Sequence, residues 1–227
     1  MSVVSRVLDL LFPPKCVFCR KLLSSHEQGW CRECEKKIPY YDDKISGDYF
    51  TFCVAPLVYR DDVREAIHRF KFSGLDCYAE TFAPLVAESL AYHGVQADVL
   101  TWAPVSRARR RERGYDQAEA LCRSLSKLLL IPARPFLTKT VDNKAQSSLD
   151  ALQRKANVLG VYGTKNEEEF AGKRVLLVDD VITTGSTLSE CSRVLLTAGA
   201  LQVTRAAIAC SVGEKEEKQV DYVSIDR

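Results

Sequence analysis

A pair of adjacent carboxylates, followed closely by hydroxyl residues and a glycine, is the feature of the sequence that most suggests chemistry. Residues 175–178 are four apolar residues with the pattern of a buried strand, and Asp179 and Asp180 come directly after them. A helical pattern begins shortly afterwards, and it is introduced by Thr183, Thr184, Gly185, Ser186 and Thr187. Because ligands in open α/β sheets bind at the carboxyl ends of the strands, we expect a binding site here.

The composition of this loop suits a phosphorylated sugar. Backbone N–H groups and hydroxyls at a helix N-terminus form a cradle for an anion, and Gly185 lets the backbone approach it closely. The two carboxylates can accept hydrogen bonds from the vicinal hydroxyls of a ribose, and they attract the Mg²⁺ that a pyrophosphate carries. A capped loop without a ligand would explain any one of these residues, whereas the complete pattern favours a ribose-phosphate site.

Residues 175–187 resemble the signature with which type I phosphoribosyltransferases bind 5-phosphoribosyl 1-pyrophosphate (PRPP), and they match it without a gap. The resemblance implies that Asp179 and Asp180 contact the ribose hydroxyls and that the loop from Thr183 to Thr187 binds the 5-phosphate. It also implies that Mg²⁺ accompanies PRPP. No Walker-type GxxxxGK[ST] sequence occurs in the chain, which argues against hydrolysis of nucleoside triphosphates.

A cluster of positive charge lies between an expected strand at residues 98–105 and an expected helix at residues 116–130. Five of the seven residues from 107 to 113 are arginine. Three interpretations stay open: a lid loop over pyrophosphate, a patch that neutralises nucleic-acid phosphates, and a solvated surface. The lid is favoured because arginine forks bind phosphate oxygens in bidentate fashion and stabilise a leaving charge.

The motif RxxxRGYDQAxxL within this region resembles the ComF family, phosphoribosyltransferase-like proteins named for natural competence and DNA uptake. By that resemblance, the pyrophosphate loop contains Val105, Ser106 and Arg107. A mobile catalytic loop would carry three further side chains toward the substrate: Arg109, Arg113 and Gln117. Most members of the family have Phe-Asn where this chain has Tyr115-Asp116. Lys71 lies in a segment that also resembles the family, and two interpretations stay open for it: a contact with a phosphate and a solvated surface lysine.

Four cysteines near the N-terminus have the spacing of metal ligands. Cys16 and Cys19 form one Cys-x2-Cys pair, Cys31 and Cys34 form a second, and eleven residues separate the pairs. Four thiolates can close a tetrahedral zinc site, and a zinc ion without an open coordination position is structural, not catalytic. The ComF family also has an N-terminal four-cysteine module, so the resemblance extends over nearly the whole chain.

Length and composition limit what else the protein can be. The 227 residues have the composition of a globular protein, with a formal net charge of +2 and no apolar stretch long enough to span a membrane. Overall charge therefore gives no argument for a nucleic-acid or membrane partner. The cysteines outside the quartet are scattered singly through apolar sequence, which is typical of reduced thiols and predicts a cytoplasmic location.

Alternating apolar strands and amphipathic helices predict an α/β protein with a Rossmann-like parallel sheet and flanking helices. Strands are expected at residues 51–59, 98–105, 173–178 and 202–210. Helices are expected at residues 61–70, 76–92, 116–130 and 186–196. With the resemblance, the predicted organisation is an N-terminal helix and a zinc-ribbon-like module over residues 1–45, then a phosphoribosyltransferase domain over residues 46–227, in which residues 46–95 form a hood and flanking helices.

Two functions are compatible with these features. In the first, an enzyme binds PRPP with Mg²⁺, an unknown acceptor attacks the anomeric carbon, and pyrophosphate leaves; positioning would dominate, because no side chain stands out as a nucleophile or base. In the second, a non-catalytic PRPP-binding adaptor contacts single-stranded DNA or a competence ATPase of the uptake machinery. The motifs together favour a competence-associated protein over a salvage enzyme.

Overall fold

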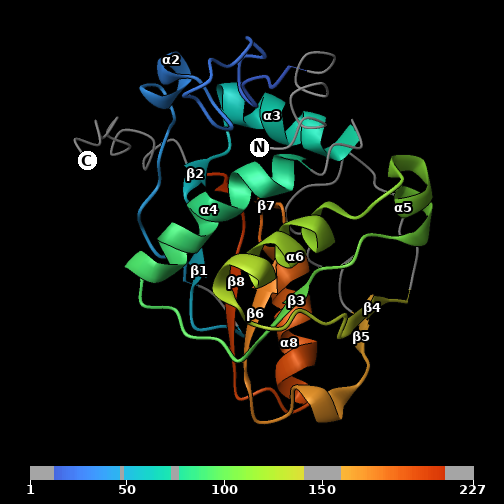
Figure 1. The fold of residues 1–227 in the computed structure, drawn as a ribbon. Helices are drawn as coiled ribbons and strands as arrows, with labels where there is room; N and C mark the ends of the chain where they lie inside the picture. Colours follow the sequence, from blue (N-terminus) through green and yellow to red (C-terminus); the bar gives the residue numbers. More distant parts are fainter. Residues whose placement is uncertain (1–12, 47–48, 73–76, 141–159, 213–227) are drawn as a thin grey trace.

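Four short parallel strands lie side by side at the centre of the fold (Figure 1). The structure is a computed structural model, and it describes residues 13–46, 49–72, 77–140 and 160–212. The order across the sheet is β1 (Cys53–Val54), β8 (Gln202–Ala206), β6 (Arg174–Val178) and β3 (Val99–Trp102). Each neighbouring pair is parallel, which confirms the predicted sheet.

A second parallel sheet continues three of these strands after a break in the hydrogen bonding. Its order is β2 (Leu57–Val58), β9 (Ala209–Cys210) and β7 (Val181–Ile182). The strands predicted at residues 51–59 and 202–210 are therefore each divided into two. At one break stands Pro56, which has no N–H to donate to a ladder. At another, between β6 and β7, stand the two adjacent carboxylates Asp179 and Asp180.

Helices cover both faces of the central sheet. On one face α4 (Cys77–Tyr92) and α6 (Gln117–Leu129) share a core with Leu100 and Leu176, and Figure 1 shows them in front of the sheet. On the other face α8 (Ser186–Thr197) shares a core with Val175 and Leu177. Successive strand residues thus enter opposite cores, as the period of two in a strand requires. The continuous apolar strands are explained by this double burial.

The connection that follows β3 and the connection that follows β6 lead toward opposite edges of the sheet. After α6, Ala133 forms a parallel bridge with Leu100 on the edge of β3 that faces away from β6. After β6, the chain passes through α8 on the other face to reach β8. The switch point of the topology therefore lies between β3 and β6, where open α/β sheets bind their ligands.

A short antiparallel pair of strands follows the segment that bridges the outer edge of β3. It consists of β4 (Leu137–Lys139) and β5 (Tyr162–Thr164), and the 3-10 helix η1 (Glu167–Glu169) follows it. The sequence predicted no strands here.

Within the described ranges, no helix is long and apolar enough to cross a membrane.

The N-terminal module packs against the helical side of the domain, beside α3 (Asp61–Phe72) in Figure 1. Its α2 helix (Arg32–Glu35) carries the last cysteine of the quartet. From α3, the Arg69 guanidinium donates hydrogen bonds of 2.7 Å to the carbonyl oxygens of Val17 and Phe18. The expected N-terminal helix at residues 3–12 lies outside the described residues.

Candidate functional site

The two adjacent carboxylates occupy the break between β6 and β7, at the switch point. The Asp179 N–H donates to the Ala206 carbonyl at 2.9 Å, and the Ile208 N–H donates to the Asp180 carbonyl at 3.1 Å, so both backbones are held by the neighbouring strand. The Asp180 N–H also donates to Asp179 Oδ1 at 2.8 Å. The pair is thus fixed at the carboxyl end of the central sheet, as the sequence predicts.

Lys71 at the end of α3 reaches this pair from a distant part of the chain. Its Nζ lies 3.1 Å from Asp180 Oδ2, and both side chains are largely buried. Burial and the neighbouring charge of Asp180 raise the pKa of Asp179, although Lys71 opposes the shift. The site therefore contains one ion-paired carboxylate beside one whose ionisation is disfavoured.

The loop after β7 forms the N-terminus of α8. Gly185 has φ +67°, in the left-handed region that glycine adopts without strain, and its carbonyl accepts from the Ser189 N–H at 2.8 Å. Thr183 and Thr184 are exposed, and the hydroxyls of Thr184 and Ser186 lie 2.9 Å apart. Hydroxyls and the N–H groups of a helix start therefore lie together, which is the arrangement of an anion cradle.

Thr187, the last residue of the predicted loop, hydrogen-bonds Tyr162 of β5. Tyr162 is buried, and this burial raises its pKa. The charges of Asp179 and Arg109 also act on this ring and affect its pKa in opposite directions, Asp179 raising it and Arg109 lowering it. Sequence reasoning missed Tyr162, because three-residue strands without strong periodicity give no signal.

The arginine-rich segment is a helix, α5 (Arg107–Arg113), and the expectation of a loop is wrong. Arginine has a high helix propensity, which a reading based on charge alone overlooks. The Ser106 hydroxyl caps the N-terminus by accepting from the Arg109 N–H at 3.3 Å, and Gly114, with φ +81°, ends the helix. Arg107 is exposed, whereas Arg109 and Arg113 are half-buried.

A fully buried amide connects this helix to the lysine. Arg113 donates to Gln117 Oε1 at 2.8 Å, and Gln117 Nε2 donates to the Lys71 carbonyl at 3.3 Å. The Arg113 guanidinium also lies 5.1 Å from the centre of the Phe72 ring. Residues that the sequence assigned to separate motifs thus form one connected cluster.

Asp116 holds the segment after β3 in place. One carboxylate oxygen accepts from the Val105 N–H at 3.0 Å, and the other accepts from the Glu119 N–H at 3.2 Å, which caps α6. Asp116 is buried, and this burial raises its pKa. The Asp116 carboxylate therefore fixes the backbone of the predicted pyrophosphate loop.

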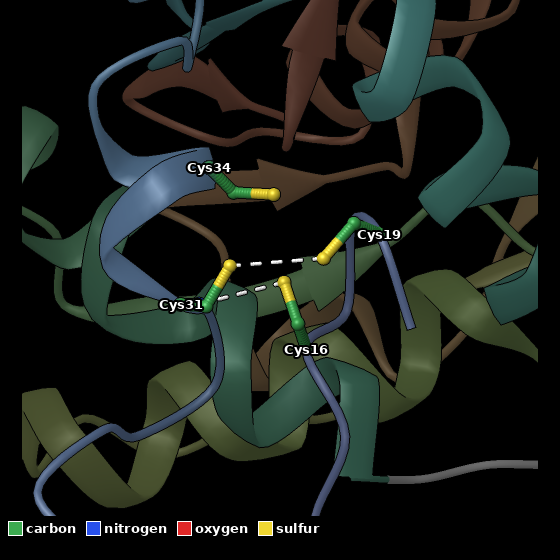
Figure 2. Close-up of side chains that lie close together, drawn as sticks. All are labelled: Cys16, Cys19, Cys31 and Cys34. Carbon is green, nitrogen blue, oxygen red and sulfur yellow. Dashed lines mark hydrogen bonds between the residues drawn. The ribbon is translucent and has the colours of Figure 1, made fainter. Parts of the chain in front are cut away.

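The four cysteines of the N-terminal module come together around one point (Figure 2). Their Sγ atoms all lie within 4.8 Å of one another, and those of Cys19 and Cys31 are 3.7 Å apart. A tetrahedral zinc ion with Zn–S bonds of about 2.3 Å has sulfur–sulfur edges of about 3.8 Å, so the quartet fits zinc. Cys16, Cys31 and Cys34 are buried, which suits a structural ion.

Two family models match the chain. Residues 113–226 match the phosphoribosyl transferase domain, and residues 7–45 match the double zinc ribbon domain. Together they confirm the predicted type I phosphoribosyltransferase fold with an N-terminal zinc module.

Similar proteins include three whose lengths the chain largely covers. Competence protein F of Haemophilus influenzae is 32% identical over 197 residues, which cover 84% of this chain and 82% of that protein. DNA utilization protein YhgH of Escherichia coli K12 is 29% identical over 210 residues, covering 89% and 86%. Competence protein ComFC of Bacillus subtilis is 29% identical over 195 residues, covering 81% and 72%.

Proposed function

The chain belongs to the ComF family of competence proteins, and from this premise we propose that it binds PRPP together with Mg²⁺ at the carboxyl ends of β3 and β6. The observation that carries the proposal is the meeting of Lys71, Asp179 and Asp180 beside the hydroxyl-rich start of α8. PRPP has a ribose with a phosphate at one end and a pyrophosphate at the other. Its phosphates require cations and an anion cradle, and its ribose hydroxyls can donate to paired carboxylates.

Each group has a role in this proposal. Asp179 and Asp180 accept hydrogen bonds from the ribose hydroxyls, and the residues from Thr183 to Thr187 hold the 5-phosphate. The backbone from Val105 to Arg107, fixed by Asp116, faces the pyrophosphate. Lys71 neutralises Asp180 in the absence of ligand and exchanges it for a phosphate oxygen when PRPP binds.

Transfer of the phosphoribosyl group to an acceptor is the reaction that this site would support. The bond from the anomeric carbon to pyrophosphate breaks, a nucleophile on the acceptor forms a new bond to that carbon, and pyrophosphate takes the electron pair. Arg109 and Arg113 would stabilise the departing charge, and bound Mg²⁺ would neutralise the pyrophosphate oxygens. If the acceptor is a nucleobase or an amine, its nitrogen attacks with a lone pair and afterwards loses its proton to pyrophosphate or water, so no general base is required of the protein.

Calorimetric titration with PRPP and Mg²⁺ tests the binding. We expect the double variant Asp179→Asn, Asp180→Asn to lose measurable PRPP binding while keeping the wild-type circular dichroism spectrum. The control Asp62→Asn removes a carboxylate from the exposed start of α3 and should bind PRPP as the wild type does. Unchanged affinity in the double variant would overturn the proposed site.

Release of pyrophosphate separates binding from transfer. The protein is incubated with PRPP, Mg²⁺ and a panel of nucleobases and amines, and pyrophosphate is measured over time. Release that depends on one acceptor and disappears in the double Asn variant supports an enzyme. PRPP binding without release from any acceptor supports the non-catalytic adaptor.

A contact with single-stranded DNA is the second candidate function, and the exposed face of α5 favours it. Arg107, Arg110 and Arg111 are exposed on this face, and relatives are described as competence and DNA utilization proteins. If these side chains neutralise DNA phosphates, affinity falls steeply with salt, and replacing all three with Gln lowers both the affinity and its salt dependence. An unchanged salt dependence would place any DNA contact elsewhere.

A competence ATPase as partner stays a prediction, as does the cytoplasmic location.

A further inference from the structure

The last turn of α3 determines where the Lys71 ammonium lies. Lys71 is the second-last residue of this helix, and its Nζ is 3.1 Å from Asp180 Oδ2. The carbonyls in the last turn of a helix have no N–H of the same helix to accept from. Because a lysine ammonium stands on a flexible four-carbon stem, it stays beside a carboxylate only if the backbone of its own turn is held in place.

The side-chain amide of Gln117 holds this turn. Its Nε2 donates to the Lys71 carbonyl at 3.3 Å, so a side chain of α6 satisfies a carbonyl at the end of α3. Gln117 is the first residue of α6, and none of its surface is exposed. Burial of an amide is unfavourable unless its oxygen and its nitrogen both form hydrogen bonds, and here both do. The amide is therefore occupied by the protein itself.

Arg113, the last residue of α5, fixes the orientation of this amide. Its Nη1 donates to Gln117 Oε1 at 2.8 Å, which leaves the amide nitrogen facing Lys71. The guanidinium carbon of Arg113 lies 5.1 Å from the centre of the ring of Phe72, the residue next to Lys71. Its Nε is buried and has no hydrogen-bond acceptor among the residues that the structure describes. Two contacts thus hold the end of α3 from α5, one through Gln117 and one at Phe72.

From these contacts we propose that Gln117 is a positioning residue, which keeps the Lys71 ammonium beside Asp180 and does not itself touch the substrate. This role differs from the direct contact with substrate that the resemblance to the family implies. The consequence for ligand binding rests on the proposed PRPP site, whereas the positioning of Lys71 requires no ligand. It matters for the site because a misplacement of about 1 Å can lower catalysis about 100-fold.

Competitive acetylation of the lysines, followed by mass spectrometry of the peptides, measures the positioning without PRPP. A largely buried ammonium that is paired with a carboxylate is poorly accessible to acetic anhydride. Gln117→Met keeps the length of the side chain and removes both of its hydrogen bonds. Relative to the exposed Lys127 of α6, Lys71 should react about fivefold faster in this variant, the factor that corresponds to the loss of one buried hydrogen bond.

Ser126→Ala is the matched control for this experiment. The Ser126 hydroxyl also joins α6 to a backbone carbonyl, that of Ile131, at 2.6 Å, and its removal should leave the rate at Lys71 unchanged. If circular dichroism shows that Gln117→Met does not fold, Arg113→Met replaces it, because Arg113 is half-buried and its loss removes the partner of the amide oxygen. An unchanged rate at Lys71 in the folded variant, or an equal increase in Ser126→Ala, overturns the proposal.

Calorimetric titration with PRPP and Mg²⁺ tests the consequence for the site. Gln117→Met should bind PRPP about tenfold more weakly than the wild type, and Ser126→Ala should bind it equally well. When Lys71 is already replaced by Met, adding Gln117→Met should weaken binding by less than about twofold, because the amide acts through the lysine. A further tenfold loss in the Lys71→Met protein would overturn the proposal, since Gln117 would then contact the substrate directly. If the wild type binds no PRPP, the proposed function fails, and the acetylation rates still decide whether Gln117 positions Lys71.

Discussion

At the scale of single residues, the ionisation of Asp179 would favour ligand binding but lowers the stability of the fold. The folded protein holds the pKa of Asp179 above the value near 4 of an unfolded chain, because the carboxyl is buried next to Asp180. A raised carboxyl pKa means that its contribution to stability is present below about pH 4 and is lost as the pH rises through the raised value. The ionised form that would bind ribose and Mg²⁺ is thus the destabilising form.

We therefore predict that Asp179→Asn stabilises the protein, and more so at pH 8 than at pH 5. A gain of about 1 kcal/mol corresponds to a rise in the melting temperature of roughly 2–4 °C for a chain of this size. Thermal unfolding of both proteins at the two pH values measures the effect. If the difference in melting temperature between Asp179→Asn and the wild type does not grow from pH 5 to pH 8, ionisation of Asp179 does not destabilise the fold.

Asp116 combines two backbone contacts in one buried carboxylate. Replacing it with Ala removes the cap of α6, worth about 1 kcal/mol, and leaves the Val105 N–H without its acceptor, worth a further 1–3 kcal/mol roughly. We expect Asp116→Ala to lose about 2–3 kcal/mol in urea unfolding and to bind PRPP more weakly. Asp116→Asn keeps one acceptor oxygen, so its stability should lie between that of the wild type and that of Asp116→Ala. Ser106→Ala removes only the cap of α5, so an equal loss there would contradict this account.

At the scale of elements, hydrogen bonds from Arg69 of α3 help to hold the zinc module on the domain. Arg69 donates to the carbonyls of Val17 and Phe18, which lie between the first two cysteines, and its Nε donates to the Tyr78 hydroxyl at 3.3 Å. Arg69→Met keeps the length of the side chain and removes the charge and all these bonds. We expect a loss of about 2–4 kcal/mol in denaturant unfolding, because buried carbonyls lose charged donors. Arg64→Met, from an exposed position of the same helix, should cost less than about 0.5 kcal/mol.

The elements that could be predicted from the sequence are those whose own residues determine them. The apolar run of β6 and the periodic pattern of α6 can be recognised in the sequence, because burial places apolar residues at the spacing of a strand or a helix. Pro56 marks the break in residues 51–59, whereas the break in residues 202–210 depends on hydrogen bonds from neighbouring strands, which no local pattern contains. For α5, charge suggested a loop where helix propensity and two end residues, Ser106 and Gly114, favour a helix.

The candidate site divides in the same way. Asp179, Asp180 and the following loop are contiguous, so their chemistry could be inferred directly from spacing. The ion pair between Lys71 and Asp180, and the hydrogen bond between Tyr162 and Thr187, join residues far apart in the chain. Such pairings follow from the topology of the sheet, and a single sequence does not reveal them.

At the scale of the whole molecule, the zinc module and the domain share one core. Cys16, Cys31 and Cys34 belong to the same cluster of buried side chains as α4, α6 and one face of the sheet. Phe18, between the first two cysteines, lies with its ring centre 6.2 Å from that of Phe82 in α4. Since the two parts are packed together, zinc should stabilise the domain as well as its own knuckles.

Removal of zinc should therefore lower the stability of the whole chain in a single transition. Cys19→Ser replaces the most exposed ligand of the quartet, and we expect it to reduce zinc content, measured by atomic spectroscopy, and to lower the melting temperature by about 5 °C or more. The control Cys122→Ala changes a buried cysteine of α6 outside the quartet, so it should keep one zinc ion per chain. If Cys19→Ser instead unfolds in two steps, with the domain melting as in the wild type, the module is an independent unit and the shared core contributes little. A single, earlier transition would mean that the metal stabilises the whole domain, including the proposed PRPP site.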